Sequence, residues 1–137
     1  MLRFPDVEAI TRTYLLDSLS GKYPGISVST RTPPSTVWTT NPTLIVFTVA
    51  GGGGEVGRVF QSLLLGFECY APSTVLASDL ARDVQAHIEH WQYLTSDVAG
   101  VNTNAFPANS TDPDTGYPSY WVSMNLMLRA TEVPNPS

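Results

Sequence analysis

A run of four glycines, residues 51–54, lies between two segments whose apolar patterns are those of β-strands. Residues 43–50 are apolar on both faces and rich in β-branched side chains, which predicts a central strand. Residues 58–70 alternate apolar and polar side chains, which predicts a strand with one buried face. The sequence therefore predicts a hairpin of two long strands with a flexible glycine connection.

The same glycines match the spacing of a nucleotide-binding loop. Gly52, Gly54 and Gly57 form a G-x-G-x-x-G pattern directly after an apolar strand. A dinucleotide loop requires a helix to begin at once, so that its N-terminus holds the pyrophosphate. Here a strand pattern follows, and no Lys-Ser or Lys-Thr pair completes a Walker loop. We therefore expect no nucleotide and no other cofactor.

The rest of the chain predicts two helices and three further strands. Apolar residues recur at helical spacing, or alternate as in strands, in separate segments. The expected helices are residues 5–19 and 73–94, and the further strands are residues 25–32, 97–107 and 118–130. Residues 1–137 are expected to form one α+β domain, with residues 1–4 and 131–137 as loose ends. Its mixed, mostly antiparallel sheet has about four to five strands, and two helices pack on its faces.

Composition narrows the classes of function. Charged residues make up 14% of the chain, against roughly 25% in a typical soluble domain. The net charge is −5 and the sequence contains no basic patch, which argues against binding nucleic acid by neutralising phosphates. A single cysteine excludes an internal disulfide, and no apolar run is long enough to cross a bilayer.

No group of residues predicts catalysis or a metal site. His87 and His90 are spaced i, i+3 on the second helix, but no third ligand accompanies them. Asp112 and Asp114 resemble part of a calcium loop without its downstream glutamate, and ordinary turn chemistry explains them. Cys69 falls on the apolar face of a strand, where an inert buried thiol is expected. We expect a protein that is not an enzyme and that holds no metal.

Aromatic residues outside the predicted core indicate an interaction surface. Trp91 belongs to a helical apolar stripe and is expected in the core, whereas Trp121 fits either core or interface. Trp38 lies in a loop bounded by prolines, where it either folds back or anchors a partner. The residues predicted to contact another subunit or partner are Trp38, Gly52, Gly54, Glu55, Arg58, Asp112, Asp114 and Tyr117.

Several segments together resemble one family. They are PDVEAITRTYLLDSL, LIVFTVAGGGG, FECYAP, STVLASDLARDVQAHI and DPDTGYPSYWVSMNLMLRA, spread over residues 4–130. In this order the chain resembles the tail terminator proteins of long-tailed, non-contractile bacteriophages, particularly those of actinobacterial hosts. The resemblance implies a virion protein at the head–tail junction. It would form a hexameric ring that caps the tail tube, stops addition of the major tail protein and meets the head-completion proteins. DNA would pass through the ring without specific binding.

Physical reasoning is compatible with such a ring. A closed ring requires two different contact patches on each subunit, and exposed strand edges or inserted loops are expected to provide them. An acidic protein also suits a lumen that must not grip DNA. Two alternatives remain: another neck or tube component, namely a head-completion, stopper or tail-tube subunit, or a small-ligand binding module that uses Trp38 and Tyr117.

Overall fold

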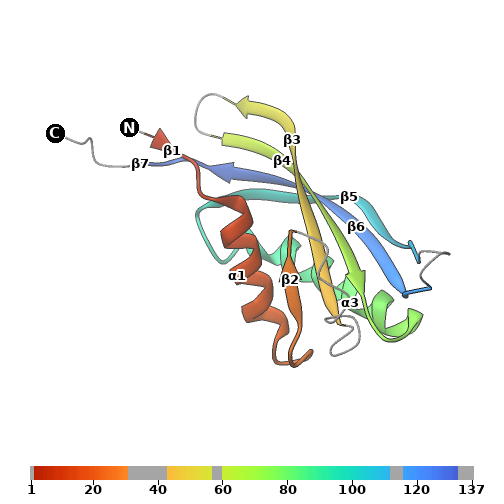
Figure 1. The fold of residues 1–137 in the computed structure, drawn as a ribbon. Helices are drawn as coiled ribbons and strands as arrows, with labels where there is room; N and C mark the ends of the chain where they lie inside the picture. Colours follow the sequence, from red (N-terminus) through yellow and green to blue (C-terminus); the bar gives the residue numbers. More distant parts are fainter. Residues whose placement is uncertain (1, 31–42, 57–59, 112–115, 133–137) are drawn as a thin grey trace.

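The computed structural model describes residues 2–30, 43–56, 60–111 and 116–132 (Figure 1). In chain order, its elements are β1 (Leu2–Arg3), α1 (Val7–Leu19), β2 (Ser27–Ser29), β3 (Leu44–Val56), β4 (Phe60–Tyr70), α3 (Thr74–Trp91), β5 (Val98–Asn109), β6 (Ser119–Arg129) and β7 (Thr131–Glu132). This order confirms the predicted α+β fold and most of the predicted elements.

The main sheet has five strands in the order β2-β3-β4-β6-β5. β2 pairs with β3 in parallel, and every other pair is antiparallel. The long strands β4 and β6 form the centre of the sheet, and they pair along their whole lengths, from Phe60 with Arg129 to Tyr70 with Ser119. The sheet is therefore mixed and mostly antiparallel, as the alternating sequence pattern predicts.

Each helix begins at a side-chain cap. The Asp6 carboxylate accepts a hydrogen bond from the Ala9 amide at 3.3 Å, and the Ser73 hydroxyl accepts one from the Leu76 amide at 3.2 Å. Such caps satisfy amides that lack a partner in the first helical turn. Both helices therefore start within two residues of the positions that the sequence predicts, and the prolines that precede the caps limit extension upstream.

Both helices pack on the same side of the sheet (Figure 1). The register places Ile45, Phe47, Leu65 and Phe67 of the hairpin on this face, and all four side chains are fully buried. The apolar stripe of α3 covers the middle and the β5 side of the sheet, while α1 packs near β2 and against α3. One apolar core results, and the opposite face of the sheet has no helix on it among the described residues.

The predicted loose ends include two short strands. β1 and β7 pair antiparallel, with Leu2 opposite Glu132 and Arg3 opposite Thr131, so the two ends of the chain lie side by side (Figure 1). Backbone hydrogen bonds hold these residues although their side chains show no strand pattern. Residues 1 and 133–137 lie outside the described part of the chain.

Candidate functional site

The glycine tract belongs to a strand. β3 continues through it to Val56 and stays paired with β4. The register moves from Gly51 opposite Leu63 to Gly54 opposite Ser62, so two extra residues are accommodated in β3. The prediction of a flexible glycine loop is therefore wrong for residues 51–56, because pairing with β4 extends β3 across them. The hairpin itself is confirmed, and the predicted strand follows the glycines.

Beyond Val46, β3 has an unpaired edge. β2 covers only Leu44–Val46, and no described strand pairs with residues 47–56 on that side. The other end of the sheet is the outer edge of β5, where again no described strand pairs. Among the described strands, the sheet thus has two different edges without a partner, on its opposite sides. Free edges carry backbone donors and acceptors that can pair with another chain.

The short strand β2 contrasts with these two edges. Arg12 on α1 donates a hydrogen bond from Nε to the Val28 carbonyl at 3.0 Å. This bond occupies an edge acceptor of β2 with a side chain of the same molecule. The helix α1 therefore covers β2, and the free edge of the sheet on this side begins one strand further in, at Phe47 of β3.

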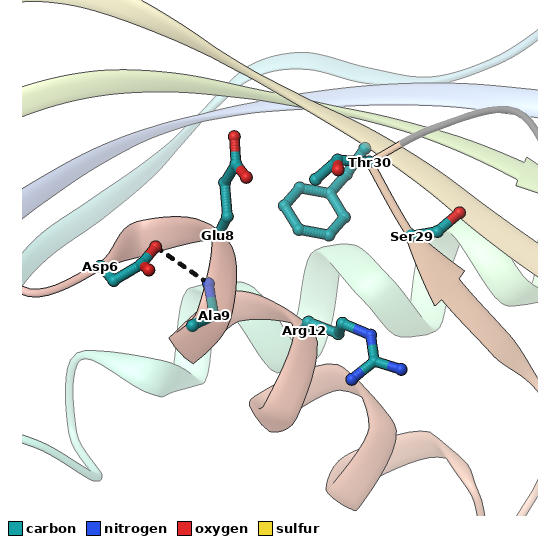
Figure 2. A pocket seen from close by; sticks show the side chains of 7 residues that line it. Asp6, Glu8, Ala9, Arg12, Ser29 and Thr30 are labelled. Carbon is teal, nitrogen blue, oxygen red and sulfur yellow. Dashed lines mark hydrogen bonds between the residues drawn. The ribbon is translucent and has the colours of Figure 1, made fainter.

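A hollow of about 390 Å³ lies where β2 ends and the free part of β3 begins. Its lining includes Ala9 and Arg12 from α1, Ser29 and Thr30 from the end of β2, and the buried ring of Phe47. Figure 2 shows α1 on one side of this hollow and the end of β2 on the other. Because Phe47 belongs to the core face, the hollow opens on the helix side of the sheet.

On the opposite face, the indole ring of Trp121 lies over Gly66. A Cβ atom at Gly66 would stand 2.2 Å from Cη2 and 2.5 Å from Cζ2 of this ring, and 3.1 Å from the Thr48 hydroxyl. Only glycine fits beneath the indole at this distance. Trp121 is half-buried there. The sequence left open whether this residue lies in the core or at an interface, and the structure places it outside the main core.

This face carries little charge. Among the described residues that the register places on it, Glu68 and Arg129 are the charged ones. The Glu68 carboxylate accepts hydrogen bonds from the hydroxyls of Ser110 at 2.6 Å and Ser119 at 2.8 Å. The Arg129 guanidinium lies over the ring of Phe60. Both charges therefore have local partners.

The acidic residues concentrate on the helix side. Those in the two helices are Glu8, Asp17, Asp79, Asp83 and Glu89. The net negative charge of the described chain thus lies mainly on the helical layer, and the open face of the sheet is close to neutral.

Two of these acids form a network that joins α3 to the turn after α1. The Lys22 ammonium lies 2.8 Å from Asp83 and 3.2 Å from Asp79, and the Tyr23 hydroxyl donates to Asp83 at 2.6 Å. Burial alone would raise the pKa of Asp83, but hydrogen bonds from Lys22 and Tyr23 outweigh it and leave that pKa below its usual value. Burial and the carboxylate of Asp83 raise the pKa of Tyr23. The two carboxylates thus hold the turn after α1 against α3.

The histidines and the cysteine of the described chain do not gather into a metal site. His87 is half-buried and His90 exposed, and no group of three or more His, Cys, Asp or Glu residues there could hold a metal ion. Cys69 is fully buried, and burial, followed by the charge of Glu68, raises the pKa of its thiol. A buried, protonated thiol is a poor nucleophile. Within the same residues, no helix is long and apolar enough to span a membrane.

The residues predicted to form an interface fall into three groups. Gly52, Gly54 and Glu55 lie in β3, within its free edge. Tyr117 lies just before β6 and is 37% exposed. The remaining four are outside the described residues: Trp38, Arg58, Asp112 and Asp114. The structure therefore places three of the predicted residues in β3 and one beside β6, and their contact with another subunit stays a prediction.

The outer edge of β5 and its exposed aromatic residue are not among the residues predicted from the sequence. Phe106 is 74% exposed, although it lies in a strand. The signal was present in the sequence, because β5 contains no charged residue and includes Pro107, which is tolerated at sheet edges. The variable periodicity of this segment obscured it, since three register irregularities interrupt the pairing of β5 with β6.

Comparison with known proteins does not place the chain in a family. No protein-family model matches it, and no curated protein sequence matches it significantly.

Proposed function

We propose that this protein is a tail terminator of a long-tailed, non-contractile bacteriophage. It would form a hexameric ring at the head-proximal end of the tail tube, stop tube growth and join the tail to the head-completion proteins. The single observation that carries this proposal is the pair of unlike edges that no described strand covers, β3 beyond Val46 and the outer side of β5. The sequence resemblance to tail terminators is the reason for placing such a ring at the end of a phage tail tube.

Unlike edges favour a ring over a symmetric dimer. A dimer with twofold symmetry uses the same patch on both subunits, whereas a ring joins one patch to a different patch of the next subunit. Here the two edges differ in length, sequence and surroundings, and they lie on opposite sides of the sheet. Repeating such a contact closes the subunits into a ring where the rotation returns to the first subunit, and otherwise gives an open filament.

The distribution of charge suits passage of DNA. If the helical layer faces the lumen, the acids of α1 and α3 repel the phosphate backbone and prevent the ring from gripping DNA. The nearly neutral sheet face is then available for contact with tail or neck proteins. Interfaces between proteins are depleted in charged residues at their centres.

The first test is the mass of the purified protein by light scattering, with negative-stain imaging. The protein is studied alone and then mixed with its major tail protein during tube assembly. Alone, the protein should form rings of a single size or remain as free subunits. In the mixture, rings should be seen on tube ends, and the tubes should stop growing. Serum albumin at the same concentration controls for nonspecific effects on assembly.

Other results point to other functions. Long tubes formed by the protein alone would identify a tube subunit. A ring that leaves tube growth unchanged but binds purified heads would identify a head-completion or stopper protein. A monomer that ignores both tubes and heads would contradict a role in the neck and would favour a small-ligand binding module.

A further inference from the structure

The outer edge of β5 is regular and uncharged over one stretch. None of the residues of β5 is charged, and its pairing with β6 has no irregularity from Gly100 to Thr103. Soluble proteins commonly protect an edge strand with charged side chains, especially lysine. The segments outside the described residues begin elsewhere: at the β2–β3 edge, at the tip of the β3–β4 hairpin, after Thr111, and next to β1 and β7. Backbone pairing with another chain is therefore unopposed by charge along Gly100–Thr103.

One face of α3 lies along this stretch of β5. The Gln85 amide donates a hydrogen bond to the Thr103 hydroxyl at 3.0 Å, and that hydroxyl donates one to the Glu89 carboxylate at 2.6 Å. Arg82 and Glu89 are seven residues apart, so they lie on the same face of the helix, and both are exposed. This face thus carries a cation on one side of Gln85 and an anion on the other.

A twofold axis perpendicular to the sheet matches this surface to itself. With the axis at Asn102, the two β5 edges meet as an antiparallel pair, and Val101 of each copy lies opposite Thr103 of the other. The two α3 helices then run antiparallel along the same side of the joined sheets. Because Gln85 is bound at Thr103, close to the axis, the Arg82 side chain of each copy lies level with the Glu89 side chain of the other.

Phe106 has a place in this arrangement. It is 74% exposed and shares the open face of the sheet with Asn104. A hollow of about 230 Å³ lies beside Gly100, and its lining includes Met127 of the same open face. Around an axis at Asn102, Gly100 of one copy lies opposite Asn104 of the other. Phe106 is then a diagonal neighbour of Gly100, at a separation that aromatic side chains span.

We propose that the free protein is a twofold dimer in which the β5 edges of two copies pair antiparallel around Asn102. Phe106 of each copy fills the hollow beside Gly100 of the other, and Arg82 lies across from Glu89. Two five-stranded sheets then form one continuous sheet. This inference goes beyond the proposed function, because it concerns the protein before assembly. The dimer and the ring use the same edge at different stages, so the dimer opens when the ring closes.

An engineered cysteine on the axis tests the pairing of the strands. Opposite residues of antiparallel strands have Cα atoms about 4.5–5.5 Å apart, which a disulfide can span. Asn102→Cys should therefore give a disulfide-linked dimer, and no larger species, on denaturing gels. Ala108→Cys is the matched control: it is exposed on the same face of β5, but its two copies lie at opposite ends of the pair. The native Cys69 is buried and does not compete. Monomeric Asn102→Cys, or equal cross-linking of both variants, would overturn the proposal.

Charge reversal tests the contact of the helices. Arg82→Glu places two carboxylates together at both ends of the contact, so the dimer should dissociate at least about tenfold more readily in sedimentation over a dilution series. Glu89→Lys should weaken it in the same way, by placing two cations together. The double variant R82E/E89K should recover the association of the parent, because opposite charges again face each other. A purely local effect on α3 would persist in the double variant, and such persistence would refute the helix contact.

Substitution of Phe106 tests its place in the hollow. Phe106→Ala should weaken the dimer at least about tenfold in the same assay. Val75→Ala is the control, because Val75 is 75% exposed, against 74% for Phe106, and lies at the start of α3. Equal association of Phe106→Ala and the parent would overturn the proposed role of this ring. Circular dichroism establishes that each variant is folded.

The dimer and the proposed function can fail separately. Free protein that sediments as a monomer, or that forms rings on its own, would overturn the dimer, and capping of tail tubes by that protein would leave the proposed function standing. Dimers of a protein that leaves tube growth unchanged would support the dimer and contradict the proposed function.

Discussion

The contact between Gly66 and Trp121 gives a prediction that can be worked through in detail. Gly66 lies in β4, with β3 on one side and β6 on the other, so its backbone cannot move aside. An alanine Cβ at this position would stand 2.2 Å and 2.5 Å from two carbons of the indole. Trp121 must therefore leave its position in the Gly66→Ala variant, or the central strands must separate.

The expected loss of stability is about 1–2 kcal/mol. Forcing extra atoms into a packed site costs about 1–3 kcal/mol. Replacing glycine by alanine also restricts the unfolded chain, which returns about 0.4–1 kcal/mol where the backbone conformation is compatible. The loss should be near the lower end of the first range, because Trp121 is only half-buried and can rotate toward solvent.

Urea unfolding followed by circular dichroism measures this loss. Gly100→Ala is the matched control, since it also lies in a strand and a Cβ there would meet no atom within 4 Å. Its stability should equal or slightly exceed that of the parent. In a Trp121→Ala background, Gly66→Ala should no longer destabilise, because the clashing ring is absent. An equal loss in both backgrounds would refute the assignment of the clash to Trp121.

Three further predictions concern single residues. Thr11 is fully buried and its hydroxyl has no hydrogen-bond partner among the described residues, so Thr11→Val should raise the free energy of unfolding by about 1 kcal/mol in the same urea assay. Cys69 should react with a thiol reagent only in denaturant, because burial raises the pKa of its thiol and blocks access; rapid reaction of the native protein would contradict this. The pKa of Asp83 is lowered in the folded state, so its contribution to stability is present above the unfolded pKa of about 3.9 and is lost as pH falls through the folded value. Asp83→Asn should therefore lower stability at neutral pH by up to about 1 kcal/mol and by less in acid, as measured by thermal unfolding across this pH range.

Much of the fold could be predicted from the period of apolar residues. The stripe Leu80, Val84 and Ile88 identifies α3, and all three side chains are fully buried. The alternation in β4 and β6 identifies the central strands in the same way. These patterns are strong because one side of each element meets the core and the other does not.

The arrangement of the elements could not be predicted in the same way. That both helices cover one face depends on contacts between them, such as the stacking of Tyr14 on Trp91, with ring centroids 4.6 Å apart. The apolar pattern predicts that a side chain such as Trp91 is buried. It does not predict which residue of another element will pack against that side chain. The pairing of β1 with β7 could not be predicted for a similar reason, because backbone pairing and one hydrogen bond from the Thr131 hydroxyl to the Arg3 carbonyl hold it, and neither leaves an apolar pattern in the sequence.

The candidate site was only partly predictable. The glycine segment was identified as a contact region, but its strand conformation comes from pairing with β4, which overrides the low strand propensity of glycine. The free edge of β5 follows from the order of strands in the sheet, and this order depends on how β6 inserts between β4 and β5. No local pattern encodes that choice.

The insertion of β6 also sets the order of events during synthesis and folding. The hairpin of β3 and β4 joins residues that are neighbours in chain order, from Val56 with Phe60 to Leu44 with Tyr70, and can form as soon as these residues leave the ribosome. The second edge of β4 cannot pair until β6 has been synthesised, since Phe60 pairs with Arg129, which comes much later in the chain. Until then, the apolar side chains of β4 are exposed unless α3 packs against them. The slow step in folding should therefore be the closure of the β4–β6 seam, and nascent chains truncated before residue 119 should be the ones that chaperones retain.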